Sequence, residues 1–162
     1  MKGEKPSLGG FNMTHQNHGV AVLVGKEEAR HFITWLLDAG EYVLTFAVAA
    51  IAADYAVKLG RAVYEAIRRR LEEDKTADFL PVKCTHPTTQ VEIILLLDAD
   101  FLRNEVQFGV SDLDALMGWA FKRYDEIVDS SQVKTVFFRM TREEPYWELD
   151  SFIDQAGRLV EV

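Results

Sequence analysis

The sequence is short of the features that mark several large classes of protein. It has a single cysteine, Cys84, so no disulfide can form within the chain, and this usage is typical of a reducing compartment. It has only four prolines and no low-complexity tract or fixed-period repeat, which argues against disorder and against a solenoid. The 162 residues, 48% hydrophobic and 27% charged, are therefore expected to form one globular domain.

Positive charge and long apolar runs are also scarce. The 18 basic residues are outnumbered by 26 acidic ones, and a net charge of −8 repels polyphosphate, which argues against a general nucleic-acid binder. Such an acidic protein still suits a basic protein partner. The most apolar window, 42–53, is too short for a membrane span of about 20 residues, and 1–19 lack the apolar run of a signal peptide. We expect no membrane span and a cytoplasmic location.

The most informative stretch is 91–100, which contains five consecutive large aliphatic residues from Ile93 to Leu97. Such a run cannot hide on one face of a strand or one stripe of a helix, so it predicts a central strand covered on both faces. Turn-forming residues in 85–89 precede it, and two carboxylates, Asp98 and Asp100, follow it. The end of a strand is where α/β proteins tend to place their chemistry.

The remaining pattern predicts a single α+β domain over 19–162 after a flexible tail, 1–18. We expect a strand at 19–25, a helix at 26–39, and one long helix at about 41–74 whose first half, 42–53, is apolar all round. A loop at 76–90 then leads to the central strand. A capping-box spacing between Ser111 and Asp114 predicts the start of the next helix. The last expected elements are a strand at 133–140, a helix starting near Pro145, and a short edge strand at 159–162.

This order of elements indicates a sheet covered by helices. We expect a ferredoxin-like or related α+β sandwich, with a sheet of three or four strands and covering helices that include the long one. A small open α/β sheet is the alternative.

Asp98 and Asp100 are candidate ligands for Mg²⁺ or Mn²⁺, because residues two apart on a strand project the same way. Such paired carboxylates serve phosphoryl-transfer enzymes, where the metal stabilises charge that develops on phosphate. A third ligand could come from Glu105, Asp112 or Asp114. The alternative is that Asp98 ends the strand and Asp100 caps the following segment. The sequence near the pair contains no phosphate-binding lysine motif and no glycine-rich loop.

A second candidate metal site combines His15, His18, Cys84 and His86, whose nitrogen and sulfur atoms suit zinc. Both pairs are expected in loops, where polar residues and a half-buried cysteine need no ligand. Cys84 could also be a nucleophile activated by His86 or His31, although the sequence offers no further member of a catalytic set.

Trp119 is a candidate interface anchor, because it falls opposite the apolar stripe of the helix that follows Ser111. Either a partner or another part of the chain could cover it. Ala115 shares its face, and the all-round apolar window adds candidate interface positions at Tyr42, Phe46 and Ala50, because such a helix is hard to bury in one small domain.

The sequence therefore favours a non-enzymatic protein-interaction or assembly module that self-associates or joins a larger complex and needs no cofactor. The alternative from another class is a Mg²⁺- or Mn²⁺-dependent, nuclease-like phosphoryl-transfer enzyme that uses Asp98 and Asp100. A small-ligand sensor with a pocket beside the long helix is a third hypothesis.

Overall fold

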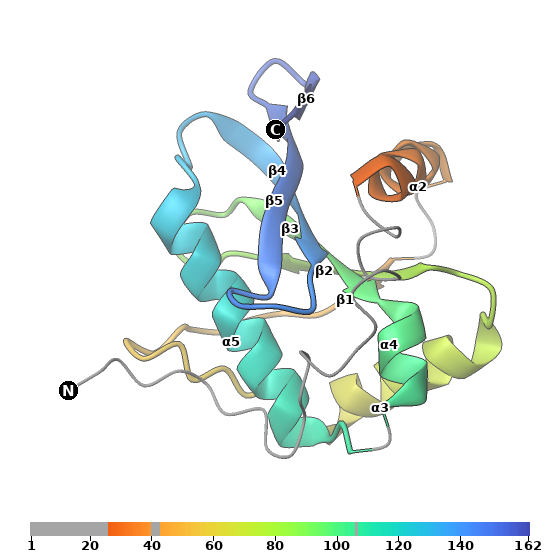
Figure 1. The fold of residues 1–162 in the computed structure, drawn as a ribbon. Coiled ribbons are helices and arrows are strands. Elements are labelled where there is room, and N and C mark those ends of the chain that lie inside the picture. The colour runs from red at the N-terminus through yellow and green to blue at the C-terminus, as the bar shows by residue number, and fades with distance from the viewer. Residues whose placement is uncertain (1–25, 40–42, 106) are drawn as a thin grey trace.

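A six-stranded mixed β-sheet organises the chain in a computed structural model that describes residues 26–39, 43–105 and 107–162 (Figure 1). The strands lie side by side in chain order, with β1 parallel to β2, β3 parallel to β4, and the other neighbours antiparallel. Their bounds are Leu44–Thr45 (β1), Phe79–Thr85 (β2), Glu92–Asp98 (β3), Val133–Met140 (β4), Trp147–Asp154 (β5) and Leu159–Glu161 (β6).

Helices cover the two faces of this sheet unequally. The larger core lies on the face that carries α3 (Arg61–Glu73), α4 (Ala99–Asn104) and α5 (Val110–Ile127). The smaller core lies on the opposite face, where α2 (Lys26–Ala39) packs Ala29, Ile33 and Leu36 against strand residues such as Phe137. Figure 1 shows α2 and α5 on opposite sides of the sheet. We refer to these as the α5 face and the α2 face.

Several predicted elements are confirmed. The aliphatic run forms β3, whose residues from Ile93 to Asp98 are all buried. Its alternate side chains enter the two cores, as a strand covered on both faces requires. The helix at 26–39, the strand at 133–140 and the edge strand near the C-terminus are also found.

The predicted fold class is correct only at its coarse level. The fold is mixed α and β, but its six strands are not a three- or four-stranded ferredoxin-like sandwich. The predicted loop at 76–90 contains β2, in which Pro81 occupies a strand position that proline usually avoids. The predicted helix near Pro145 is instead the strand β5, because this segment pairs with β4 and β6. Tyr146, with a φ of 69°, ends the turn between β4 and β5.

The long helix predicted at 41–74 is also wrong, because α3 is the only helix among the described residues of that range, 43–74. Gly60 at its N-terminus has a φ of 87°, and Tyr55 has a φ of 59°, so both stand outside the helical region. The preceding apolar residues alternate instead: Phe46 and Val48 pack on the α5-face core, whereas Ala47 and Ala49 are exposed. We call residues 46–59 the strap, since they run from β1 across α5 without regular secondary structure.

The strap is attached to α5 at three places. The Leu59 N–H donates to Asp114 Oδ1 at 2.9 Å, and the Tyr55 hydroxyl donates to Asp125 Oδ2 at 2.8 Å. Between them, the Tyr55 carbonyl oxygen lies so close to Gly118 that a Cβ on Gly118 would collide with it. Helix α5 itself starts slightly before the predicted position, at Val110, where Asp112 Oδ2 accepts the Gly109 N–H at 2.8 Å.

The predicted tail at 1–18 and the predicted strand at 19–25 lie outside the described residues.

Candidate functional site

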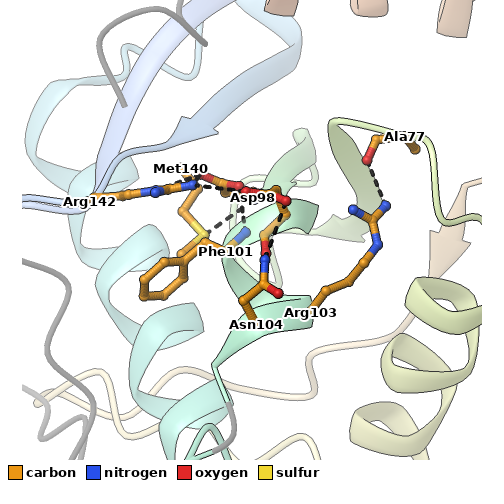
Figure 2. Close-up of polar contacts among 8 residues, drawn as sticks. Ala77, Asp98, Phe101, Arg103, Asn104, Met140 and Arg142 are labelled. Atoms are coloured by element: carbon orange, nitrogen blue, oxygen red, sulfur yellow. Dashed lines mark hydrogen bonds and ion pairs between the residues drawn. The ribbon is translucent and has the colours of Figure 1, made fainter. Parts of the chain in front are cut away.

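The end of β3 places Asp98 in a buried ion pair. Its Oδ1 accepts the Phe101 N–H at 3.0 Å, which caps the start of α4. Its Oδ2 accepts from Arg142 Nε and lies equally close to Nη2, each at 2.9 Å. Arg142 also lies over the Phe101 ring, 5.1 Å from its centre, so the guanidinium contacts both an ion partner and an aromatic face (Figure 2). Asp98 is therefore occupied by protein donors on both oxygens.

Asp100 approaches the same guanidinium from the solvent side. Its Oδ2 is 3.9 Å from Arg142 Nη2, its side chain is mostly exposed, and its carbonyl oxygen accepts from Asn104 at 2.8 Å. Arg103 points away from this pair and donates to the carbonyl oxygen of Ala77 (Figure 2). It also donates to the carbonyl oxygen of Asp74. The two carboxylates thus converge on Arg142, which supplies the positive charge that the sequence hypothesis assigns to a divalent metal.

Each residue considered as a third metal ligand accepts a hydrogen bond from a backbone N–H group. Asp112 caps α5, Asp114 accepts the Leu59 N–H, and Glu105 Oε1 accepts the Gln107 N–H at 3.2 Å. Burial raises the pKa of Asp112, with the Glu105 charge adding to this rise, while the bond from Gly109 opposes it. In the described part of the chain, no three His, Cys, Asp or Glu side chains gather as a metal site would require.

The second candidate metal site is not supported, because its thiol, that of Cys84, lies in the core. His15 and His18 lie outside the described residues. Cys84 and His86 lie on and just beyond β2 rather than in a long loop, and Cys84 is fully buried in the α5-face core. Burial raises the pKa of the Cys84 thiol to about 12. A buried, protonated thiol is a poor nucleophile and a poor ligand, and His31, its other possible base, is exposed on α2.

His86 holds a turn with both of its ring nitrogens. Nδ1 accepts the N–H groups of Thr88 and Thr89, each at 3.2 Å, so the ring proton is assigned to Nε2. Nε2 then donates to Asp125 Oδ1 at 3.2 Å, and the ring stacks on Tyr124. His86 therefore ties the β2–β3 turn to α5 and has no ring nitrogen left for a substrate.

The predicted interface residues are dispersed. Trp119 is only 8% exposed and packs against Tyr146, with ring centres 4.3 Å apart, so another part of the chain covers it. Ala115 and Phe46 are half-buried against the same core. Ala50 is exposed on the strap, and Tyr42 lies outside the described residues. Of the two alternatives that the sequence leaves open for Trp119, the structure shows cover by another part of the chain, because the β4–β5 turn brings Tyr146 onto it.

A tryptophan that does face solvent stands on α2. Trp35 is 49% exposed, and its ring contacts Phe32, whose ring in turn packs against Phe79 of β2. A groove of about 490 Å³ runs beside it between α2 and the segment that joins α3 to β2. Apolar side chains line much of the groove and charged ones complete it: Phe32, Trp35, Leu71, Phe79, Leu80 and Pro81, with Arg70, Glu73 and Asp74. We call this groove, together with Trp35, the α2 groove surface.

The sequence pattern that makes Trp119 a candidate interface residue also applies to Trp35. Both tryptophans fall off the apolar stripe of a strongly predicted helix, which for α2 is Ala29, Ile33 and Leu36. The helical pattern cannot show which of the two a distant segment covers. The difference lies in the β4–β5 turn, which reaches α5 and has no counterpart among the described residues beside Trp35.

Comparison of the chain with protein-family models, with curated proteins and with solved structures finds no match in any of the three. Within the described residues, no helix has the length and apolar character that crossing a membrane requires.

Proposed function

We propose that this protein is a non-enzymatic interaction module that self-associates through the α2 groove surface. The observation that carries the proposal is the half-exposed Trp35 beside an apolar groove. Tryptophan and arginine are the residues most enriched among those that dominate binding energy, and here Trp35 and Arg70 line one groove. Exposed apolar patches that are contiguous and rimmed by polar residues often mark binding sites on soluble proteins.

A second copy of this chain is the proposed occupant. A two-fold interface uses the same surface on both subunits, so a groove and a protruding ring on one surface can both be buried at once. The walls of the groove carry both signs of charge, with Arg70 near Glu73 and Asp74, which suits contact with an identical surface. Two copies of charge −8 repel each other at long range, so we expect association to strengthen as salt rises.

The experiment is light scattering coupled to size exclusion over a range of protein and salt concentrations. The wild type is expected to form dimers at high concentration, more so at high salt. Trp35→Ala should raise the dimer dissociation constant at least tenfold. The matched control is Ile127→Ala, which trims another exposed apolar side chain, 39% exposed, on the opposite face of the sheet. A monomer at every concentration, or equal losses in both variants, would contradict the proposal.

The alternative, a Mg²⁺- or Mn²⁺-dependent phosphoryl-transfer enzyme, requires Asp98 to exchange Arg142 for a metal. Its support is the convergence of two carboxylates at a strand end, with Asp100 still accessible to solvent. Calorimetric titration with Mg²⁺ or Mn²⁺ tests it directly, with Arg142→Met as the variant that should tighten metal binding by removing the competing charge. Absence of binding in both proteins would eliminate this alternative.

A further inference from the structure

A second cavity lies on the α5 face, between the strap and the turn that joins β2 to β3. It has a volume of about 390 Å³ and is lined by Ala49–Ala53 and Tyr55 of the strap, by His86, Pro87 and Thr88 of the turn, and by Asp125 of α5. Pockets of a few hundred cubic ångströms commonly hold small ligands or single side chains. The interaction module proposed above does not use this pocket.

Asp125 gives the pocket a negative charge, and its basic neighbour in the lining is His86 rather than a lysine or an arginine. Its two oxygens accept from the Tyr55 hydroxyl and from His86 Nε2, which are neutral donors. Its side chain remains 38% exposed, so the lone pairs that those two bonds leave are accessible. None of the described residues that line the pocket is a lysine or an arginine. The carboxylate is thus held in place by two hydrogen bonds but not neutralised.

Residues of the strap form another wall of the same pocket. Residues 49–53 line it, and among the described residues no hydrogen bond is made to the carbonyl oxygens of Ala49, Ala50 or Ile51. An unpaired backbone carbonyl needs a donor from water or from a ligand. Tyr55 follows them with a φ of 59°, a conformation that is uncommon for a bulky residue and is held here by its bond to Asp125.

The negative charge near the pocket also acts on Tyr55. Its hydrogen bond to Asp125, its burial, and the charges of Asp125 and Glu126 all raise the pKa of Tyr55. Glu126 has a basic neighbour of its own, Arg123, at 3.9 Å on the same helix. The local charge at the pocket is therefore set mainly by Asp125.

From this geometry we infer that the pocket binds an organic cation with a primary ammonium group, which donates to Asp125 and to carbonyl oxygens of the strap. An ammonium has three N–H donors and no acceptor, which matches a pocket lined by a carboxylate and by residues whose carbonyl oxygens accept no other hydrogen bond. Its bond to the carboxylate is charge-assisted and hence stronger than a bond between neutral groups. The ammonium can belong to a free amine or to a lysine side chain of a peptide.

The experiment is an NMR titration of the full chain with n-butylammonium, followed on the backbone amides of 49–53 and Thr88. We expect saturable shifts with a dissociation constant in the millimolar range, and at least tenfold weaker binding of n-butanol, which has the same length and no charge. Nα-acetyl-lysine methylamide and 1,4-diaminobutane then distinguish the two sources, because the tighter binder identifies a peptide side chain or a free amine.

Variants complete the test. Asp125→Asn should weaken n-butylammonium binding at least tenfold, whereas Tyr55→Phe, which removes a competing donor and keeps the carboxylate, should bind as well as the wild type or better. Equal binding of n-butylammonium and n-butanol would overturn the inference, and so would undiminished binding by Asp125→Asn. If Asp125→Asn fails to fold, the comparison of the two ligands on the wild type still decides the matter. None of these outcomes depends on whether the chain self-associates.

Discussion

The two faces of the sheet differ in how completely the chain covers them. On the α5 face, three helices, the strap and the β4–β5 turn enclose a large core, and even Trp119, off the stripe of its helix, is covered by Tyr146. On the α2 face, among the described residues, one helix covers a small core and leaves Trp35 and Leu37 about half exposed. A tryptophan off the apolar stripe of its helix is therefore buried in the fold on the α5 face and remains accessible to solvent on the α2 face.

Because of this difference, we expect the α5 face to determine the stability of the fold and the α2 face to determine binding. A side chain buried in the α5-face core contributes to folding whether or not a partner is present. An exposed indole removes little apolar area from water until another surface covers it. We therefore expect substitutions on the α5 face to lower the free energy of unfolding, and Trp35 substitutions to act on association instead.

The largest effect is expected for Phe121→Ala, which empties a fully buried position on the α5 face. Loss of the ring and the cavity left behind should lower the free energy of unfolding by about 3–5 kcal/mol. Urea denaturation followed by circular dichroism measures it. A loss below about 1 kcal/mol would mean that the α5-face core is loosely packed, which would weaken the contrast between the two faces.

Gly118→Ala should have the next largest effect. Its Cβ would meet the Tyr55 carbonyl oxygen, so the strap must move away from α5. We expect a loss of about 1–3 kcal/mol, the usual cost of overpacking. Lys122→Ala on the exposed side of the same helix is the control, since it introduces alanine without a collision. If Gly118→Ala proved as stable as the wild type, the strap would not be held against α5 as described.

A smaller effect concerns pH. Burial raises the Cys84 pKa from its usual 9.0 to about 12, so the folded state keeps a proton that the unfolded state loses. The stability from this protonated thiol is nearly complete below pH 9 and is lost as pH rises towards 12, with about 1 kcal/mol gone by pH 10. Cys84→Ala should therefore lose less stability than the wild type between pH 7 and pH 10 in urea denaturation. Identical losses would show that the thiol is accessible to solvent.

The strongly patterned elements of the fold were predictable from the sequence. The aliphatic run of β3, the amphipathic helices α2 and α5, and β4 each carry enough local signal to outweigh alternatives. The strap, β2 and β5 were missed, because alanine-rich segments suit a helix locally and Pro81 and Pro145 favour a loop or a helix start. In each case tertiary pairing decided the conformation: β2 and β5 lie between neighbouring strands, and the strap lies against α5.

The candidate sites were less predictable than the fold. Asp98 was identified from its place at a strand end, but its partner Arg142 is 44 residues away in sequence, and only the parallel pairing of β3 with β4 brings the two together. The pocket at Asp125 joins three segments, the strap, the β2–β3 turn and α5, none of which carries a recognisable motif. A site assembled from distant segments leaves no spacing for a sequence pattern to reveal.

The most direct test of the proposed interface uses fluorine NMR of the protein labelled with 5-fluorotryptophan. The chain has three tryptophans, of which Trp119 and Trp147 are buried and Trp35 is half exposed, so three resonances are expected. The resonance of Trp35 is assigned by its absence in Trp35→Phe. As protein concentration rises, the Trp35 resonance should shift or broaden while the other two stay unchanged. A Trp35 resonance that stays constant over the range in which the chain associates, or a change confined to Trp119, would contradict the account.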